Sequence, residues 1–476
     1  MTNYDYDIEC YPNFFSIRFT RDTDGAKWCF EISQWMNQGR ELNVFLNQLA
    51  MTKCRLVGFR NLNYDYPMVH LIMQNDGIVN NTMLYDKSQA IINDQKFDQF
   101  AHTVREWDVK IPQVDLSKIH HFDNKAKMTS LKLLEFNMRM DDIQELPYDP
   151  LLPVTREQAD HLLTYNDHDV FATGKFRAFT AGMISFRDDL SEKYGKDFTN
   201  HNDTRIGADI VVMELAKHGV RAHKSIQTIR SKIVINDIIL PYIQFESPEF
   251  NQVLNFFRGS VMDPDKIKGF FKHSEESEET KFTSATINGF TFDFGAGGIH
   301  GCVSKPQTFH SDENFVIVDI DYASFYPNIA IKNNLYPEHL GLGWCRAMED
   351  MFNERIRVGK NSAMGKAYKL GLNGSYGKSN DKHSPFYDPQ YTMAITINGQ
   401  CIISMLCEML MMKIPDFKLI FVNTDGICCY IPRFYEEYLH KLCEWSDVQT
   451  GLTLECQNYK MLAVKDVNNY IGVIEE

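Results

Sequence analysis

Short apolar runs that end in polar residues recur along the chain, and two of them end near an aspartate. Residues 315–318 (FVIV) precede Asp321, and residues 419–422 (LIFV) precede Asp425. Apolar runs of this length that are rich in β-branched and aromatic residues predict buried strands. The pattern therefore places each aspartate where a buried strand ends.

The same pattern divides the chain into stretches of different character. Residues 1–180 alternate between strand-like and helix-like patterns, which predicts an α/β domain. Residues 181–290 are predicted to be a helical connecting region, because residues 207–218 (GADIVVMELAKH) are apolar at helical spacing. Residues 274–280 (SEESEET) are polar and charged and predict a surface loop. A chain of 476 residues is too long for one core, so two or three domains are expected.

Asp321 and Asp425 would form a cation-binding site if the fold brings them together. Two carboxylates a few ångströms apart in a pocket of low dielectric repel one another unless a cation lies between them. Mg²⁺ prefers oxygen ligands of this kind. Two such ions would activate a hydroxyl nucleophile, steady a leaving pyrophosphate and neutralise the charge that develops in an in-line phosphoryl transfer. The pair therefore predicts a nucleotidyl-transfer site.

Three segments in this region resemble motifs A, B and C of family B DNA polymerases, in particular the compact bacteriophage enzymes. They are, in sequence order, residues 321–327 (DYASFYP), 369–377 (KLGLNGSYG) and 423–426 (NTDG). One such motif alone carries little weight, whereas three in the family's order are specific. The resemblance implies that Asp321 and Asp425 are the metal ligands. It also implies that the Tyr322 carbonyl helps to bind metal and that Tyr326 discriminates between sugars.

Motif B supplies residues for the incoming nucleotide. Lys369, Asn373 and Tyr376 fall at positions i, i+4 and i+7 of a predicted helix and therefore share one face. By the resemblance, Lys369 and Asn373 face the nucleotide, and Arg355 and Lys360 precede motif B as the phosphate-binding residues of polymerase fingers do. A solvated amphipathic helix pair is the alternative for the two arginines, Arg355 and Arg357. The basic residues of this region are Arg355, Arg357, Lys360, Lys366, Lys369, Lys378 and Lys382.

Two positions depart from the family pattern. Asn423 stands where motif C begins with aspartate, and Gly374 stands where motif B has serine. The second aspartate of motif C is the principal ligand in the family, so activity is expected to survive with a less acidic pocket. Gly374 costs about 1 kcal/mol of helix stability. Asp319 shares a strand face with Asp321 because it lies two residues earlier, and it is interpreted as structural.

A second set of carboxylates lies in the first third of the chain. Asp7 and Glu9 are at positions i and i+2 of a predicted strand, so both project from one face. Asp65 follows the apolar residues 56–59 (LVGF), which places it at a strand-to-helix turn. These three carboxylates are therefore predicted at the ends and on one face of neighbouring elements.

A helix farther along completes this set. Residues 155–158 (TREQ) match a capping box, which predicts that a helix begins there. Tyr165 and Asp169 then lie at positions i and i+4 and share a face. The set resembles the Exo I (DxE), Exo II (Nxx(F/Y)D) and Exo III (YxxxD) motifs of DEDDy 3′ to 5′ proofreading exonucleases, whose domain is RNase H-like. The resemblance implies that Tyr165 orients the attacking water and that two metal ions are held by Asp7, Glu9, Asp65 and Asp169.

Three further segments resemble parts of the same family. Residues 130–135 (SLKLLE) look like a segment of the exonuclease domains, in which Lys132 would touch phosphates, although an exposed helix lysine is the preferred interpretation. Residues 294–301 (FGAGGIHG) resemble the YxGG segment near the template strand, although the tyrosine of that segment is absent and an ordinary glycine turn is the competing interpretation. Residues 465–472 (KDVNNYIG) resemble the KxY region that binds the primer terminus, with Tyr470 matching and Asn468 in place of the usual lysine.

The spacing of the motifs predicts which family modules are absent. The stretch between motifs A and B leaves no room for the large insertion of protein-primed members, so priming from a terminal protein is disfavoured. Family members continue beyond the KxY region into a thumb that holds duplex DNA, whereas only a few residues follow Tyr470. The thumb is therefore expected to be absent from this chain.

Composition narrows the function classes. The formal net charge of −14 argues against a protein that simply coats DNA, but not against a polymerase, which needs only local basic grooves. The eleven cysteines form no CxxC pair, and Cys428 and Cys429 fall in a predicted strand, so neither a zinc site nor an iron–sulfur cluster is expected. With an acidic N-terminus and no apolar run judged long enough to cross a bilayer, we expect a cytoplasmic protein, in the host cell if the chain is of phage origin.

Together these patterns predict a DNA-dependent DNA polymerase with a proofreading exonuclease, of mixed α/β and α+β class. The expected cofactor is Mg²⁺, two ions per site, with Mn²⁺ as a substitute. The expected partners are primer–template DNA, dNTPs, and a second chain that carries the thumb or a processivity factor, with no membrane. The alternative is a nuclease subunit of a split polymerase that binds primer–template and polymerises only with a partner chain. The expected domains are an exonuclease (1–180), a helical connection (181–290), a palm with an antiparallel sheet (291–345 and 385–476) and short helical fingers (346–384).

Overall fold

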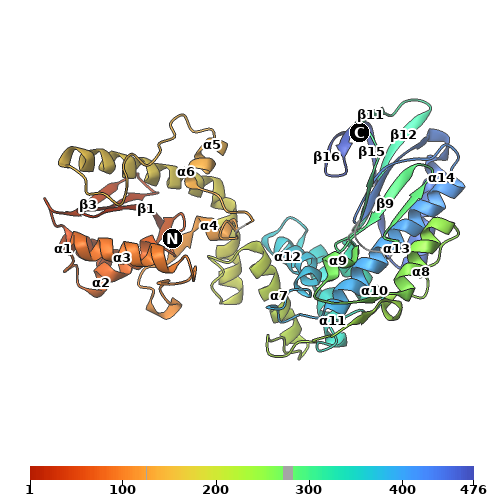
Figure 1. Ribbon diagram of the computed structural model, residues 1–476, viewed down its shortest axis with the longest axis horizontal. Coiled ribbons are helices and arrows are strands. Elements are labelled where there is room, and N and C mark those ends of the chain that lie inside the picture. Colours follow the sequence, from red (N-terminus) through yellow and green to blue (C-terminus); the bar gives the residue numbers. More distant parts are fainter. Residues whose placement is uncertain (125, 272–281, 476) are drawn as a thin grey trace. The chain divides into compact units, whose positions relative to one another are not determined.

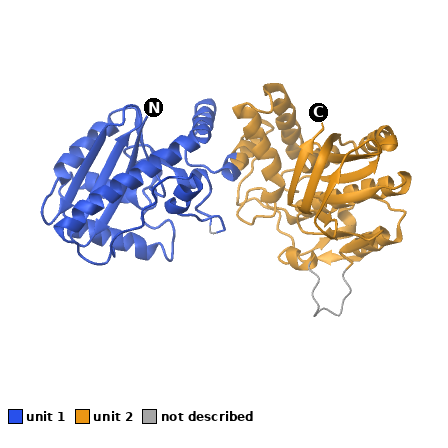
Figure 2. Cartoon of the chain, turned by 90° about the horizontal axis from the view of Figure 1, so that it is seen from above, with its two compact units in different colours: residues 1–206 blue, residues 207–476 orange. Residues whose placement is uncertain are grey.

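The computed structural model of the chain describes residues 1–124, 126–271 and 282–475. The chain packs as two compact units, Met1–Ile206 and Gly207–Glu476 (Figure 2). Each unit mixes helices and strands, so the mixed class expected from the sequence is confirmed at that level. The loop predicted at residues 274–280 lies outside the described residues.

The first unit is built on a five-stranded sheet in the order β3-β2-β1-β4-β5. β1 is antiparallel to β2 and parallel to β4, and β4 is parallel to β5. Figure 1 shows α6 along one face of this sheet and α1 to α3 along the other. The strands are β1 Thr2–Tyr11, β2 Phe14–Arg21, β3 Lys27–Ser33, β4 Cys54–Gly58 and β5 Gln113–Asp115. The helices are α1 Gly39–Ala50, α2 Asp65–Gln74, α3 Asn81–Asp94, η1 Glu106–Asp108, α4 Leu116–Ile119, α5 Leu131–Asn137 and α6 Arg156–Tyr194.

Strand β1 divides its side chains between the two faces with period two. Tyr4, Tyr6 and Ile8 belong to the apolar core on the side of α1 to α3. The alternate residues face α6, because Asp5 pairs with Arg177 of that helix. Asp7 and Glu9 therefore project toward α6, on the face opposite to the main core.

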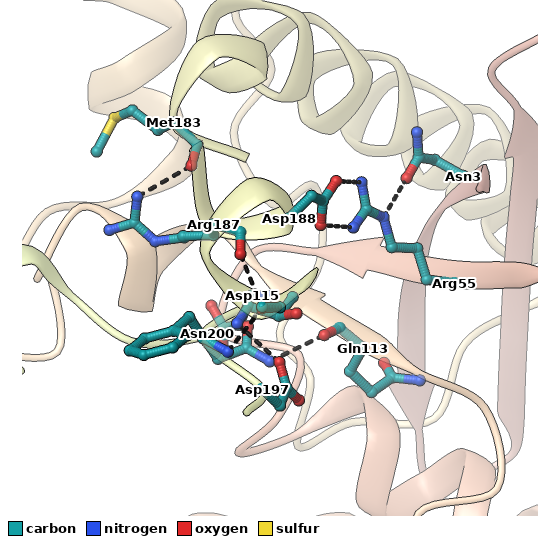
Figure 3. Close-up of polar contacts among 12 residues, drawn as sticks. Asn3, Arg55, Gln113, Asp115, Met183, Arg187, Asp188, Asp197 and Asn200 are labelled. Carbon is teal, nitrogen blue, oxygen red and sulfur yellow. Dashed lines mark hydrogen bonds and ion pairs between the residues drawn. The ribbon is translucent and has the colours of Figure 1, made fainter. Parts of the chain in front are cut away.

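Helix α6 is long and is tied to the sheet at several points. It begins with the predicted capping box, in which Thr155 accepts from the Gln158 amide, and it ends before Gly195 at φ 62°. Arg177 binds Asp5 of β1 through two hydrogen bonds of 2.6 and 3.0 Å. Two further hydrogen bonds, of 2.7 and 3.0 Å, join Arg55 of β4 to the Asp188 carboxylate (Figure 3). These pairs fix the helix face that carries Tyr165 and Asp169.

The second unit is built on an antiparallel sheet in the order β11-β15-β12-β14-β13-β10-β9-β8, with β16 paired to β15. Its strands are β8 Ser284–Ile287, β9 Phe290–Phe294, β10 Ile299–Cys302, β11 Gln307–His310, β12 Phe315–Tyr322, β13 Lys418–Asn423, β14 Gly426–Pro432, β15 Leu454–Asp466 and β16 Asn469–Ile474, with a separate pair β6 Ile233–Val234 and β7 Val261–Met262. Helix α7, Asp203–Lys217, begins in the last residues of the first unit and continues into the second. The other helices of the second unit are η2 Ile235–Ile238, α8 Pro248–Gly259, α9 Ile267–Phe271, α10 Phe325–Lys332, α11 Leu342–Val358, α12 Ala363–Lys378, α13 Pro389–Lys413, η3 Arg433–Tyr435 and α14 Glu436–Thr450.

Strand β12 shows the same division of faces as β1. Tyr322 points toward the helices, because its hydroxyl lies 2.6 Å from the Ser446 hydroxyl of α14. Ile317 packs in the apolar cluster of the opposite face. Asp319 and Asp321 share the parity of Ile317, so both project from the face that α14 does not cover.

Helix α13 of the second unit is long and largely apolar. By length and composition it is able to cross a membrane, and 78% of its apolar window is buried inside the structure. The expectation that no segment of the chain is apolar and long enough for this is therefore wrong. Its small and polar positions, Gly399 and Gln400, lie against the glycine-rich turn and motif A described below.

Candidate metal centres and nucleotide cleft

The first unit brings together carboxylates that are far apart in sequence. Oxygens of Asp7, Glu9 and Asp169 all lie within 4.8 Å of one another. Asn166, one turn before Asp169 on α6, donates to Asp7 Oδ2 at 3.0 Å. Two of the three residues come from β1 and one comes from α6, as the spacing of the sequence predicts. The cluster consists of hard oxygen donors, which suit Mg²⁺ or Mn²⁺.

Asp65 joins this cluster from the turn between β4 and α2. It is the first residue of α2 and is 5% exposed, and its carboxylate accepts from the Ile8 amide, between Asp7 and Glu9 of β1. Across the turn, the Tyr66 amide donates to the Asn61 carbonyl at 2.8 Å, and the Asn61 side-chain amide donates to Gln113 Oε1 at 2.9 Å. The turn therefore places Asp65 beside the β1 carboxylates.

Strand β5 holds this turn in place through Asp115. The Asp115 carboxylate accepts from the backbone amides of Arg60 and Leu62, at 3.0 and 3.3 Å. Asn200 holds β5 in turn, because it accepts from the Asp115 amide at 2.7 Å and donates to the Gln113 carbonyl at 2.8 Å (Figure 3). The position of Asp65 thus depends on residues that the sequence motifs do not include.

Burial and mutual repulsion make these carboxyls weak acids when no cation is present. Burial, followed by the charges of Asp65 and Asp169, raises the pKa of Asp7 well above its usual value. Burial and Asp169 act in the same direction on the pKa of Glu9. Burial raises the pKa of Asp65 to about 7. Such a cluster is stabilised by a bound divalent cation, which removes the repulsion.

Lys132 of α5 is a member of this site and not a solvated helix lysine. Its ammonium group pairs with Asp169 and lies 3.4 Å from Glu135, which is fully buried. The same group lies 4.7 Å from the centre of the Tyr165 ring. The preferred interpretation of Lys132 as an exposed residue is therefore wrong, since its side chain is only 19% exposed.

Tyr165 lies on the same face of α6 as Asp169, as predicted. Burial, followed by the charges of Asp169 and Glu9, raises the pKa of its hydroxyl far above the usual value. The hydroxyl therefore stays protonated and is able to donate or accept a hydrogen bond beside the carboxylates. A neutral hydroxyl in this place is suited to hold a water molecule.

In the second unit, the register of the sheet brings Asp321 and Asp425 together. Asp321 of β12 is paired with Gly426 of β14, which follows Asp425 directly. The Tyr322 amide donates to the Asp425 carbonyl at 2.9 Å. Asp425 therefore sits in the β13–β14 turn, next to the end of β12. Burial and then Asp425 raise the pKa of Asp321 to about 6.

Glu455 is a third carboxylate at this position, and the sequence motifs did not indicate it. It lies on β15, directly opposite Asp321 on the other side of β12. Its charge contributes to the raised pKa of Asp321, after burial and Asp425. Asp319 lies deeper on the same strand, where the Tyr459 hydroxyl donates to it at 3.3 Å. Only the pairing of β12 with β15, which is distant in sequence, identifies Glu455.

A cleft of about 800 Å³ adjoins these carboxylates. Motif A lines it with Tyr322 and Tyr326, and motif C lines it with Asp425. The cleft is also lined by Arg355 of α11, by Lys360 of the loop that joins α11 to α12, and by Lys369, Asn373 and Tyr376 of α12. The three residues of α12 predicted to share a face thus open onto one space with the aspartate of motif C.

The basic residues of this region fall into two groups. Arg355 lies 3.4 Å from the Ser324 hydroxyl, and Lys360 lies 4.0 Å from Glu455 at the cleft. Others pair with carboxylates elsewhere: Arg357 with Glu354, Lys378 with Asp381, and Lys382 with Asp265. Arg355 and Lys360 therefore remain candidates for phosphate binding, whereas those three have other partners.

The remaining family-like segments also take defined positions. Residues 295–298 form the turn between β9 and β10. Tyr470 of β16 stacks on Phe421 of β13, with ring centres 4.9 Å apart. No model of a known protein family matches the chain, and no curated protein matches it either.

Proposed function

We propose that the chain is a template-directed DNA polymerase of the family B type, with a 3′ to 5′ exonuclease of RNase H-like fold in its first unit. The polymerase proposal rests on one observation: motif A, the α12 face and motif C, which are far apart in sequence, open onto a single cleft. A cleft of about 800 Å³ is of the size that binds small molecules such as nucleotides.

The residues of the cleft fit the parts of a nucleotide. Lys369 and Arg355 supply positive charge for phosphates, and Asn373 supplies an amide for polar groups of the sugar or base. Tyr326 is 6% exposed, and its aromatic ring would pack against the sugar of the nucleotide. Two Mg²⁺ ions held by Asp321 and Asp425 would polarise the attacking hydroxyl and offset the charge on the leaving pyrophosphate.

The first unit supports hydrolysis of a phosphodiester. Asp7, Glu9 and Asp169 form a compact oxygen-donor cluster with Asp65 beside it, and the four carboxylates would hold two metal ions on a scissile phosphate. Tyr165 and Lys132 border that cluster. Tyr165 is placed to orient a water molecule, and Lys132 offsets the negative charge that the carboxylates and the phosphate bring together.

A single primer–template assay with Mg²⁺ tests both activities. The purified chain is incubated with a 5′-labelled primer on a longer template, with and without dNTPs. Extension with dNTPs and shortening without them is the expected result. Shortening under both conditions would favour the nuclease subunit that needs a partner chain, and an unchanged primer under both conditions, with Mg²⁺ or Mn²⁺, would reject the proposal.

A further inference from the structure

The turn between β9 and β10 contacts both motif A and motif C. The Tyr326 hydroxyl donates to the Gly297 carbonyl at 2.6 Å. The amide of Thr424, which precedes Asp425, donates to the Ile299 carbonyl at 2.9 Å. Burial raises the pKa of Tyr326 far above its usual value, so the hydroxyl keeps its proton and remains a donor. This short turn thus joins two segments of the cleft.

Gly298 is the position at which this contact is closest. A Cβ on Gly298 would lie 2.9 Å from Thr424 Oγ1 and 3.1 Å from the Tyr326 hydroxyl. Both distances are shorter than ordinary van der Waals contact, so the Thr424 side chain and the Tyr326 hydroxyl would both have to shift, the hydroxyl by a few tenths of an ångström. At Gly297, by contrast, a Cβ would meet no atom within 4 Å among the residues that the structure describes. Two adjacent glycines therefore differ in what a methyl group would disturb.

The turn itself is anchored on helix α13. The Gly295 amide donates to the Gly298 carbonyl at 3.0 Å and to Gln400 Oε1 at 2.9 Å. Gln400 is fully buried, and its amide group donates to the Thr396 carbonyl of the same helix at 2.9 Å. A buried amide with both ends satisfied is a rigid support. The turn is therefore fixed independently of Tyr326.

The Tyr326 ring is enclosed on its other sides. A Cβ on Gly399 of α13 would lie 2.9 Å from Tyr326 Cε1, so the ring packs directly on the helix backbone. The ring of Tyr376 meets it edge-on, with centres 4.6 Å apart and planes at 68°. Helix α13 and Tyr376 limit the tilt of the ring, and the turn limits the position of its hydroxyl.

We propose that Gly298 is a specificity-determining residue, which lets the β9–β10 turn hold the Tyr326 ring where it excludes the 2′-hydroxyl of a ribonucleotide. The inference rests on the proposed polymerase function and deepens it. Gly298 has no side chain that could contact substrate, so it acts as a positioning residue through Tyr326. The Tyr326 ring excludes ribose only if its position is fixed, because a ring that moves by the width of a hydroxyl makes room for the 2′-hydroxyl. Pocket differences of this size change selectivity by roughly 10–200-fold.

The test compares three variants, Gly298→Ala, Gly297→Ala and Tyr326→Phe, in single-nucleotide extension of a primer–template. For each variant kcat and KM are measured for one dNTP and the matching rNTP. Gly298→Ala displaces the tyrosine, and Tyr326→Phe keeps the ring but removes its anchor. Both are expected to raise the relative efficiency for the rNTP by about tenfold or more, mainly through its KM. Gly297→Ala keeps the carbonyl and is expected to keep the selectivity of the parent protein.

The outcomes separate the inference from the function on which it rests. Parental selectivity in Gly298→Ala and Tyr326→Phe, with dNTP incorporation retained, would overturn the role of the turn and leave the polymerase proposal standing. Equal loss of selectivity in Gly297→Ala and Gly298→Ala would also overturn it, since the close contact at Gly298 would then not be the cause. If the parent protein incorporates no dNTP, the proposed function fails and the inference fails with it. Should Gly298→Ala not fold, Tyr326→Phe decides, because it removes only one hydroxyl.

Discussion

Gly426 and Asp321 face one another across β14 and β12, and a Cβ on Gly426 would overlap the Asp321 carboxylate. The glycine that follows Asp425 thus leaves the space in which the two aspartates approach one another. A glycine is therefore required at position 426 for a steric reason, namely the position of the Asp321 carboxylate, in addition to any preference of the turn.

Gly426→Ala is therefore expected to lower the rate of primer extension by about 100-fold while the protein still folds. The added methyl group forces Asp321 away from its position, and misplacement by about 1 Å of a group at the reacting centre costs on the order of 100-fold in rate. Overpacking of this kind lowers stability by about 1–3 kcal/mol. Extension rates and thermal unfolding are the measurements. Gly259→Ala at the end of α8 is the control, because its Cβ meets no atom within 4 Å among the described residues. Wild-type extension by Gly426→Ala would contradict this account of the site.

The two carboxylate clusters are expected to be separable by mutation, because they lie in different units and share no residue. Asp425→Asn should reduce extension by at least about 100-fold, the scale for loss of one group that stabilises developing charge. It should leave degradation of the primer intact. Asp7→Ala combined with Glu9→Ala should do the opposite. If either change removed both activities from a folded protein, the assignment of two sites would be wrong.

The parts of these sites that follow from local spacing could be predicted from the sequence. Asp7 and Glu9 share a strand face because side chains alternate, and Tyr165 and Asp169 share a helix face because they are four residues apart. The capping box at the start of α6 could likewise be predicted from the sequence, because it depends on four consecutive residues. Each of these inferences uses only the geometry of one element.

The parts that depend on pairing between distant segments could not be predicted. Glu455 reaches the site only through the register of β15 against β12, and Lys132 joins the carboxylates only because α5 packs beside α6. An isolated lysine on a short helix looks like a solvated residue in the sequence. Similarly, the contact of Tyr326 with Gly297 depends on where the β9–β10 turn falls in space. Such contacts are set by tertiary packing, for which no local pattern exists.

Lys132→Met is expected to lower the exonuclease rate by about 10–100-fold, the range for a residue that supports metal ligands. The change keeps an unbranched apolar side chain, one atom shorter, and removes the charge that faces Asp169 and the buried Glu135. Extension is expected to stay unchanged, since Lys132 lies in the first unit. Degradation of a single-stranded 5′-labelled oligonucleotide over a range of Mg²⁺ concentrations measures the effect.

Two comparisons make the Lys132 test specific. Lys127→Met alters an exposed lysine of the preceding loop and should leave degradation unchanged. Lys132→Arg keeps the positive charge and should recover part of the lost rate. A Lys132→Met protein with the parental rate and the parental Mg²⁺ dependence would show that the ion pair with Asp169 is structural only.

The raised pKa of Asp65 predicts that the metal-free protein loses stability as the pH rises. Burial raises this pKa to about 7, whereas an aspartate in an unfolded chain titrates near about 3.9. A carboxyl with a higher pKa in the folded state stabilises the fold while it is protonated. Its contribution is therefore complete below about pH 4 and is lost as the pH rises through about 7. Asp7, Glu9 and Asp169 shift in the same direction, so their effects add to that of Asp65.

We accordingly expect the melting temperature in EDTA to decrease as the pH is raised from about 5 to about 8. Each unit of pKa shift contributes about 1.4 kcal/mol to the free energy of unfolding. Mg²⁺ should restore more stability at the higher pH, because it binds the ionised carboxylates and competes with protons at the lower pH. Asp65→Asn should flatten the pH dependence in EDTA, since the amide is neutral throughout and removes one repelling charge. Thermal unfolding of both proteins, with and without Mg²⁺, measures this. Two results would contradict this account: a melting temperature in EDTA that rises from about pH 5 to about pH 8, or an effect of Mg²⁺ that is equal at both pH values. Either result would mean that the carboxylates are ionised without a metal and that other charges compensate for their burial.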